Sequence, residues 1–299
     1  MDLLLHLRIF QRVAEAGSFS RAAEQLAMAP SSVSAAVQKL EQHLGARLLQ
    51  RTTRRVHPSS DGTLLLARCR TFLSDAGEME QLFRTGERPA GLLRVEVPAR
   101  MARLQIAPAL PAFLAEHPGV SIEFGGSDRI ADLVGEGIDC VLRVGDPGDF
   151  NLAARPLGQL RQATCAAPTL LDAHAPVREV ADIAALPAVH FGRHPLDRPE
   201  AFEFIVDGAV TRVPMRGRVA AGNAETYIAC ALAGLGVIQV PRYDIADALQ
   251  DGALVELLPA CPPPGLPMHA LYPPQHRSSR LLQVFIDWLE ALMAPHVAH

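Results

Sequence analysis

The sequence predicts a mixed α/β protein with a helical N-terminal part, one long connecting helix and a two-lobed α/β C-terminal part. Three observations predict this fold class. Apolar residues recur at helical spacing through the first sixty residues, a heptad-like spacing continues from Leu65 to Phe83, and alternating strand patterns interleaved with helices begin near Gly91. At about 150 residues per domain, a chain of 299 residues also suggests two domains.

The composition changes near Pro89, where we place a domain boundary. The whole chain has a formal net charge of −4, which on its own argues against a nucleic-acid-binding protein. Residues 1–88 nevertheless hold twelve basic and nine acidic residues, a net +3, while the remainder holds sixteen and twenty-three, a net −7. Only Pro30 and Pro58 of the 24 prolines precede residue 89. The N-terminal part is therefore the part suited to an anionic partner.

Membrane and secreted classes are disfavoured. No segment reaches ~18 uninterrupted apolar residues, and no signal-peptide pattern begins the sequence. The cysteines are odd in number, scattered and without a C-x-x-C pair, so we expect reduced, mostly buried thiols in a cytoplasmic protein. They are Cys69, Cys140, Cys165, Cys230 and Cys261.

Three short helices are predicted before residue 46. Gly17 ends the first, Ser20 can cap the second, and the turn Ala27–Pro30 leads into the third. Proline suits the first turn of a helix because its missing N–H would be unpaired there, and Gly45 can end the third helix in the left-handed conformation. The buried faces of the first and third helices are predicted to be Leu3, Leu7, Phe10, Val13, Val33, Val37, Leu40 and Leu44.

The opposite face of the third helix carries short polar side chains. Hydroxyls and amides on such a face can approach base edges and phosphates in a major groove. The residues of this helix that we expect to contact DNA are Ser31, Ser32, Ser34, Ala35, Gln38 and Lys39.

Residues 48–58 predict two short strands around a basic turn, that is, a wing. No acidic residue occurs between Glu41 and Asp61. Guanidinium groups at this density fit phosphate oxygens or a narrow minor groove. The alternative, a helical subdomain with a solvated arginine face, agrees less well with the turn, the polar helix and the wing together. The wing residues that we expect to contact DNA are Arg51, Thr52, Arg54 and Arg55.

This ordered set of residues resembles the LysR-type transcriptional regulators. The resemblance rests on Ala14–Leu26, Ser31–Ser34, Leu40, Glu41, Leu44, Gly45, Leu48, Arg51–Arg54 and Gly62. Two positions depart from the family pattern: Pro30, where a glutamine is common, and Ala35, where a basic residue is common. The resemblance covers nearly the whole chain and implies a DNA-binding dimer, often joined into a tetramer, whose C-terminal domain binds an effector.

A linker helix is predicted from Ser59 to about Gly86, on the order of 40 Å long. Its apolar residues alternate at steps of four and three, which suits a helix that pairs with a copy of itself. Because helix-turn-helix proteins usually bind as dimers to two DNA half-sites roughly 34 Å apart, we expect this helix to pair with a second copy rather than to pack on its own domain. The expected dimerisation residues are Leu65, Cys69, Phe72, Ala76, Met79 and Phe83.

From Gly91 onward the pattern is α/β. Strands over 93–97, 120–124 and 138–144 alternate with helices, which predicts a parallel βαβαβ unit. A second block over 162–267 contains strands at 188–191 and 237–240 and helices at 223–233 and 243–249. A strand over 267–272 and a helix over 278–293 then return to the first block, so two lobes joined by two crossings enclose a cleft. The family resemblance implies the fold of type 2 periplasmic binding proteins.

Ligands of such sheets bind at the carboxyl ends of strands. Helix N-termini in the cleft, together with Arg100 or Arg103, could hold an anion. Many relatives hold a carboxylate with a small hydroxyl residue at this place, which this chain lacks. The expected effector-binding residues are Ala99, Arg100, Met101, Ser127, Asp128, Gly145, His190, Phe191, Asn223 and Tyr227.

Enzyme motifs are absent from the sequence: it has no H-E-x-x-H, G-x-S-x-G or P-loop pattern. Gly234 and Gly236 follow a helix and precede a strand, the reverse of a dinucleotide site. His190 and His194 lie four apart, but Pro195 disfavours a helix that would join them at a metal. We therefore expect no enzyme activity, no cofactor and no metal.

These observations predict DNA binding by residues 1–58, dimerisation by 59–88 and effector binding by 89–299, with lobe 1 over about 89–161 plus 268–299 and lobe 2 over about 162–267. The expected partners are double-stranded promoter DNA, a small-molecule effector, further copies as a dimer or tetramer, and RNA polymerase. The alternatives are a DNA-binding protein whose C-terminal domain serves only oligomerisation, a periplasmic solute-binding protein, and an enzyme acting in the cleft. The basic N-terminal part disfavours the second, and the lack of a catalytic set disfavours the third.

Overall fold

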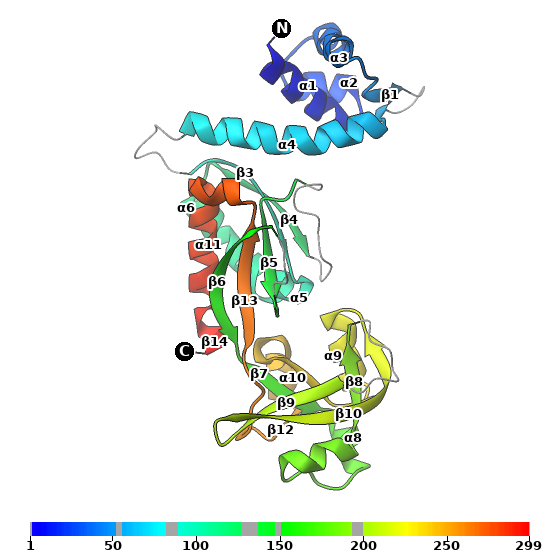
Figure 1. The fold of residues 1–299 in the computed structure, drawn as a ribbon, viewed down its shortest axis with the longest axis vertical. Coiled ribbons are helices and arrows are strands. Elements are labelled where there is room, and N and C mark those ends of the chain that lie inside the picture. The colour runs from blue at the N-terminus through cyan, green and yellow to red at the C-terminus, as the bar shows by residue number, and fades with distance from the viewer. Residues whose placement is uncertain are drawn as a thin grey trace.

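The computed structural model describes residues 2–51, 56–81, 89–126, 137–146, 151–192 and 200–298. Figure 1 shows a helical N-terminal domain, the long helix α4 beneath it, and two α/β lobes that follow along the longest axis. Among the described residues, no helix is both long enough and apolar enough to cross a membrane.

The N-terminal domain consists of three helices and a short hairpin, with Phe10, Val33 and Leu40 fully buried between them. Its elements are α1 (Leu3–Ala16), α2 (Phe19–Gln25), α3 (Pro30–Leu44), β1 (Leu49–Arg51) and β2 (Val56–Pro58). The two strands pair antiparallel, which confirms the hairpin that the sequence predicted.

The ends of the helices follow local chemistry. Gly17 and Gly45 end α1 and α3 in the left-handed conformation, with φ of 61° and 66°, as predicted. The predicted cap of α2 is wrong by two residues. Ser18, not Ser20, lies in extended conformation before the helix and accepts the N–H of Arg21.

Two contacts hold α3, β1 and α4 (Ser60–Gln81) together. One carboxylate oxygen of Glu41 accepts the N–H groups of Leu48 at 2.8 Å and Leu49 at 3.1 Å. The first turn of α4 packs so closely on Leu48 that a Cβ at Gly62 would overlap the Leu48 carbonyl oxygen. Ser59 caps α4, since its hydroxyl oxygen accepts the N–H of Gly62 at 3.0 Å. The predicted start of the linker helix is therefore confirmed.

Some of the predicted dimerisation residues are buried in the N-terminal domain and others are exposed. Cys69 is buried in the core of its own N-terminal domain, which contradicts the prediction that it meets a partner helix, while Leu65 is half-buried against the same core and its contact with a partner stays a prediction. Phe72, in contrast, is 50% exposed. Ala76 is half-buried, while the side chain of Met79 lies outside the described part and so does Phe83.

The first lobe is built on a six-stranded sheet in the order β14-β6-β13-β5-β3-β4. Strands β3, β4 and β5 are parallel, as predicted, whereas β13 runs antiparallel to both β5 and β6. The predicted helix around Ile130–Val134 lies outside the described residues. The strands are β3 (Gly91–Val97), β4 (Val120–Gly126), β5 (Cys140–Val144), β6 (Ala153–Leu160), β13 (Leu266–Tyr272) and β14 (Val297–Ala298).

The helices of the first lobe bury an apolar face on this sheet, where Phe113 and Phe285 meet edge to face at 5.8 Å. A π-helical turn, η1, interrupts the helix after β3 and ends two residues before Pro108, which has no N–H to donate. The helical elements are α5 (Ala99–Met101), η1 (Ala102–Ile106), α6 (Ala107–Glu116), η4 (Pro274–Ser278), α11 (Arg280–Met293) and η5 (Ala294–His296).

The second lobe contains two three-stranded sheets, in the orders β8-β10-β9 and β11-β7-β12. Its strands are β7 (Gln162–Ala166), β8 (Pro187–Phe191), β9 (Glu200–Val206), β10 (Ala209–Ala221), β11 (Ile238–Pro241) and β12 (Val255–Leu257). Its helical elements are α8 (Pro168–Asp172), η2 (Val180–Ala185), α9 (Ala224–Leu232), η3 (Arg242–Ile245) and α10 (Ala246–Gln250). The chain enters this lobe between β6 and β7 and leaves it between β12 and β13.

The long hairpin of β9 and β10 was not predicted, although the sequence carries its signal. Asp207 and Gly208 join the strands and both have positive φ, 50° and 79°. An Asp-Gly pair between two alternating runs is the usual signature of a two-residue hairpin turn.

The contact at Gly62 gives a test of the N-terminal domain. Gly62→Ala places a methyl group against the backbone of Leu48, so we expect a loss of about 2 kcal/mol in unfolding free energy, despite the better helix propensity of alanine. Urea unfolding followed by circular dichroism measures this loss. Arg68→Ala, an exposed change on the same helix, is the control and should stay within about 0.5 kcal/mol of the parent. Equal stability of the two variants would contradict the close packing.

Candidate functional site

The first candidate site is the outer face of α3. Ser31, Ser32, Ala35, Gln38 and Lys39 are all exposed, as the sequence predicted. Ser34 is half-buried. The opposite face, with Val33, Val37 and Leu40 fully buried, fixes this orientation, because it leaves no second way to pack the helix.

The N-terminus of α3 is exposed and has no side-chain cap. Its N-cap residue is Ala29, which has no side-chain acceptor, and Pro30 occupies the first helical position. The exposed hydroxyls of Ser31 and Ser32 follow at once. At this helix end the N–H groups of Ser32 and Val33 donate to the carbonyl oxygen of Ala29, so the N–H of Ser31 and the serine hydroxyls are the groups that can donate to a phosphate oxygen.

The described strands of the wing, β1 and β2, pair with each other, and β2 contacts α1 and α4. The backbone of Arg51 belongs to β1 and pairs with Val56. The other predicted wing contacts, Thr52, Arg54 and Arg55, lie outside the described residues. Glu41, the last acidic residue before the wing in the sequence, directs its carboxylate to the N–H groups of Leu48 and Leu49.

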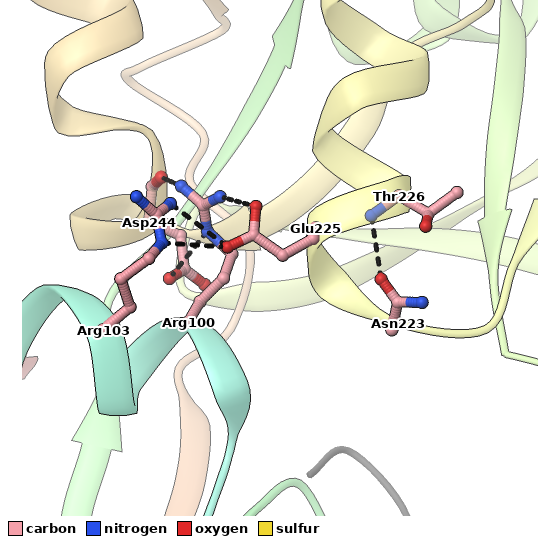
Figure 2. Close-up of polar contacts among 6 residues, drawn as sticks. All are labelled: Arg100, Arg103, Asn223, Glu225, Thr226 and Asp244. Carbon is pink, nitrogen blue, oxygen red and sulfur yellow. Dashed lines mark hydrogen bonds and ion pairs between the residues drawn. The ribbon is translucent and has the colours of Figure 1, made fainter. Parts of the chain in front are cut away.

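The second candidate site lies between the lobes, where α5 and η1 of the first lobe approach α9 and η3 of the second (Figure 2). Arg100 is the centre of this contact. Its guanidinium pairs with Glu225 at 2.6 Å and with Asp244 at 3.3 Å, and it also donates to the backbone oxygen of Asp244. Arg103 pairs with the second oxygen of Glu225 at 3.1 Å. We call these four residues the interlobe cluster.

The burial of the interlobe cluster is uneven. The side chains of Asp244 and Arg100 are 4% and 11% exposed, whereas Glu225 and Arg103 are 48% and 61% exposed. The inner pair is thus shielded from water and the outer pair faces it. The prediction that Arg100 holds an anionic ligand is wrong for this arrangement of the lobes, because two carboxylates of the second lobe already occupy its guanidinium.

The other predicted effector residues separate into three groups. Met101 is buried in the first-lobe core and Tyr227 in the second-lobe core, so neither lines a cleft and both predictions are wrong. His190 is 2% exposed on β8 and is also not a lining residue. Ser127 and Asp128 lie outside the described residues.

Four predicted residues remain at or near the lobe surfaces. Ala99 begins α5, directly before Arg100. Asn223 caps α9, since its side-chain oxygen accepts the N–H of Thr226 at 2.9 Å (Figure 2). Phe191 is 42% exposed and contacts the buried ring of Tyr227 edge-on. Gly145 follows β5 with a positive φ of 94°.

Sequence reasoning missed Glu225 and Asp244. Glu225 lies in the first turn of α9, at the start of the helix predicted over 223–233, so its place at a helix N-terminus could have been read from the sequence. Asp244 follows β11 by three residues, a position that the strand-end rule covers. Their pairing with Arg100 has no local signal, because the partners lie 125 and 144 residues apart in the chain.

Three of the cysteines have buried thiols. Burial raises the pKa of the Cys69 thiol to about 11 and the pKa values of Cys140 and Cys165 to about 12, so these thiols stay protonated at neutral pH. Among the residues that the structure places, no three His, Cys, Asp or Glu side chains gather as a metal site.

Comparison with known protein families agrees with this arrangement along the chain. The family model described as "Bacterial regulatory helix-turn-helix protein, lysR family" matches residues 4–63. The model described as "LysR substrate binding domain" matches residues 86–294. Together they span the helical N-terminal domain and both lobes.

Individual relatives match over almost their full length. The chain is 35% identical over 298 residues to the Escherichia coli HTH-type transcriptional regulator YhjC, covering 99% of this chain and 100% of YhjC. It is 32% identical over 291 residues to the E. coli HTH-type transcriptional activator AaeR, covering 97% and 93%. The solved structure of CrgA, a LysR-type transcriptional regulator from Neisseria meningitidis, aligns with a TM-score of 0.58 and 28% identity, covering 96% of this chain and 97% of CrgA. The chain belongs to the LysR family of transcriptional regulators, which bind DNA through the helix-turn-helix domain.

Proposed function

We propose that this regulator binds a partly palindromic operator through α3 and the wing, and that a small molecule between the lobes modulates this binding. The exposed polar face of α3 carries the proposal. Gln38 and Lys39 lie on that face with the serines of the first turn, which suits contacts to base edges and phosphates in a major groove. In this proposal Arg51, Thr52, Arg54 and Arg55 bind the backbone or the minor groove.

The proposed division of labour follows the fold. Residues 1–58 bind promoter DNA, 59–88 dimerise and 89–299 bind the effector, while RNA polymerase is the further partner at the promoter. For dimerisation we now favour an exposed face of α4 that keeps Phe72 of the predicted seam and adds Leu64, without the buried Cys69. Leu64 and Phe72 are 68% and 50% exposed and lie eight residues apart, on one side of the helix. Apolar side chains of this size on a long helix suit a second copy of the chain.

The interlobe cluster supports a role for the lobes in sensing. Arg100 and Arg103 belong to the first lobe and Glu225 and Asp244 to the second, so each of their ion pairs requires the lobes to be close. A ligand that competes for Glu225, or that bridges the same surfaces, changes the balance between lobe arrangements by its differential affinity for them. Such a change can alter the spacing of the DNA-binding domains in a dimer.

The alternative is a DNA-binding protein whose lobes serve only assembly. The two proposals differ in one observable, the dependence of DNA affinity on a small molecule. Fluorescence anisotropy with the DNA upstream of this protein's own gene, against random DNA and over a salt series, measures specific binding. The same assay, run with a panel of small metabolites, then separates sensing from assembly.

Two substitutions on α3 test the roles of its exposed face. Lys39→Ala should weaken binding to specific and random DNA alike and reduce the slope of log affinity against log salt by about 0.9, the value of one lost phosphate contact. Gln38→Ala should mainly reduce discrimination between operator and random DNA, by about 1 kcal/mol or less for a single neutral contact. Both are read by anisotropy. Glu24→Ala, an exposed change on α2, is the control. Unchanged binding by both variants would contradict the proposed role of α3.

The unequal burial of the interlobe cluster gives a second test. Arg100→Ala leaves the Asp244 carboxylate buried without its main counter-charge, so we expect a loss of about 3 kcal/mol or more in unfolding free energy. Arg103→Ala removes a pair to the same Glu225 at the exposed side and should cost at most about 1 kcal/mol. Urea unfolding followed by the fluorescence of Trp288, the single tryptophan of the chain, measures both.

A double variant keeps this test informative if Arg100→Ala folds poorly. Adding Asp244→Asn removes the uncompensated charge, so Arg100→Ala/Asp244→Asn should be more stable than Arg100→Ala alone. Equal losses for Arg100→Ala and Arg103→Ala, or no recovery in the double variant, would contradict the buried pair.

A further inference from the structure

A hollow of about 310 Å³ lies at the junction of the two lobes, next to the interlobe cluster but on other residues. We call it the junction pocket. Its size is within the range of about 300–1,000 Å³ that is common for small-molecule sites. Segments far apart in the sequence form it, and its lining residues are Gln105, Arg161, Arg242, Tyr243, Ala246 and His296.

Two arginines of the junction pocket are held side by side by the backbone. Arg161 lies in the crossing from β6 to β7, and its carbonyl oxygen accepts the N–H of Arg242 at 2.9 Å. The side chain of Arg161 donates to the carbonyl oxygen of Pro295 through one terminal nitrogen, and its backbone N–H bonds to His296. These bonds fix where the Arg161 guanidinium stands.

Within the part of the chain that the structure describes, only part of the positive charge of the pocket is compensated. Arg242 pairs with Glu256 at 2.9 Å through one terminal nitrogen and remains 50% exposed. Each guanidinium has five N–H donors, and these contacts engage one nitrogen of each. Burial and the neighbouring Arg161 lower the pKa of His296, so the imidazole is neutral at pH 7 and adds no charge.

The remaining walls are apolar or amide. The rings of Tyr243 and His296 lie 5.3 Å apart, centre to centre, and Tyr243 packs on the first-lobe core. Ala246 adds a methyl group. Gln105 contacts His296 Nε2 at 3.0 Å and so keeps the ring in place. The pocket therefore joins guanidinium donors to a flat, largely apolar surface.

We propose that the junction pocket binds a small organic carboxylate with an apolar body, at a site separate from the interlobe cluster. The carboxylate accepts N–H groups of Arg161 and Arg242, as guanidinium forks bind carboxylates, and the apolar body lies against the rings of Tyr243 and His296. This site goes beyond the proposed function, because binding here requires neither DNA nor the cleft.

The place of the pocket connects it to the lobes. Arg242 and Tyr243 line it, and the next residue, Asp244, holds Arg100 across the lobes. Gln105 likewise lies on η1 with Arg103. An occupant of the junction pocket therefore fixes the same short segment, η3, that carries the buried ion pair.

Calorimetric titration of the full-length chain tests the proposal. The probes are phenylacetate and hexanoate, each paired with its neutral amide, together with inorganic sulfate. We expect at least one carboxylate to bind with one site per chain and its amide to bind at least tenfold more weakly. No heat from either carboxylate at 10 mM (roughly the weakest useful affinity) overturns the proposal. Sulfate that binds as well as the carboxylates also overturns it, because the pocket then selects charge alone.

Matched arginine variants locate the binding. Arg161→Gln and Arg242→Gln should each weaken carboxylate binding at least tenfold. Arg212→Gln is the control, since Arg212 is an exposed arginine that pairs with Glu203 on the β9–β10 hairpin, as Arg242 pairs with Glu256. Circular dichroism checks that each variant is folded, and Arg242→Lys, which keeps the charge, should retain part of the affinity. Binding that survives both arginine-to-glutamine changes overturns the assignment. The DNA-binding assay is independent, so failure here leaves the proposed function standing.

Discussion

The buried ion pair between Arg100 and Asp244 is the contact on which the arrangement of the two lobes depends. A carboxylate that is 4% exposed has lost most of its hydration, and a guanidinium at 3.3 Å is what offsets that loss. Arg100 also binds the backbone oxygen of Asp244 and the carboxylate of Glu225. All three acceptors belong to the second lobe. Separation of the lobes would expose the charges to water but break every one of these bonds at once.

This pairing decides where the lobes can recognise a charged ligand. The strand-end position of Arg100 suits an anion, yet its positive charge is already neutralised by carboxylates from the facing lobe. On the neighbouring side of η3, Arg161 and Arg242 lie together, and among the described residues the carboxylate paired with them is that of Glu256. The excess of positive charge at the lobe junction thus lies beside the cleft rather than within it. Arg100 differs from Arg161 and Arg242 in the carboxylates that pair with it, and not in its position at the end of a strand.

The N-terminal domain is joined to the first lobe by weaker forces than those that hold it together. Inside the domain, Glu41 binds two backbone N–H groups and Gly62 lies directly against Leu48. Between the domain and the lobe, Glu15 of α1 contacts Arg94 at 3.8 Å, while Arg94 binds the partly exposed Glu123 at 2.6 Å. Partly exposed pairs of this kind contribute at most about 1 kcal/mol. Among the described residues, this ion pair adds less to the attachment of the N-terminal domain than the contacts inside the domain add to its own packing.

The sequence predicted what local spacing controls. The three helices, the wing strands, the start of α4 and the parallel strands of the first lobe follow from periodicity and from glycine and serine at helix ends. The cap of α2 was misplaced because Ser18 and Ser20 are both good caps, and only the backbone conformation selects one. Met101 and Tyr227 were predicted to line the cleft because they follow a strand end or a helix start. Their positions along the helix instead direct their side chains into the cores of the first and second lobes.

The interlobe cluster lay beyond such reasoning for a different reason. Its members come from α5, η1, α9 and η3, and none of those segments specifies by its own sequence how the lobes meet. Their contacts exist only in one arrangement of the lobes, so their position is a property of the whole fold. A ligand changes a conformational equilibrium only through contacts that differ between the arrangements. The residues that local sequence could not place are therefore the ones whose contacts depend on how the two lobes meet.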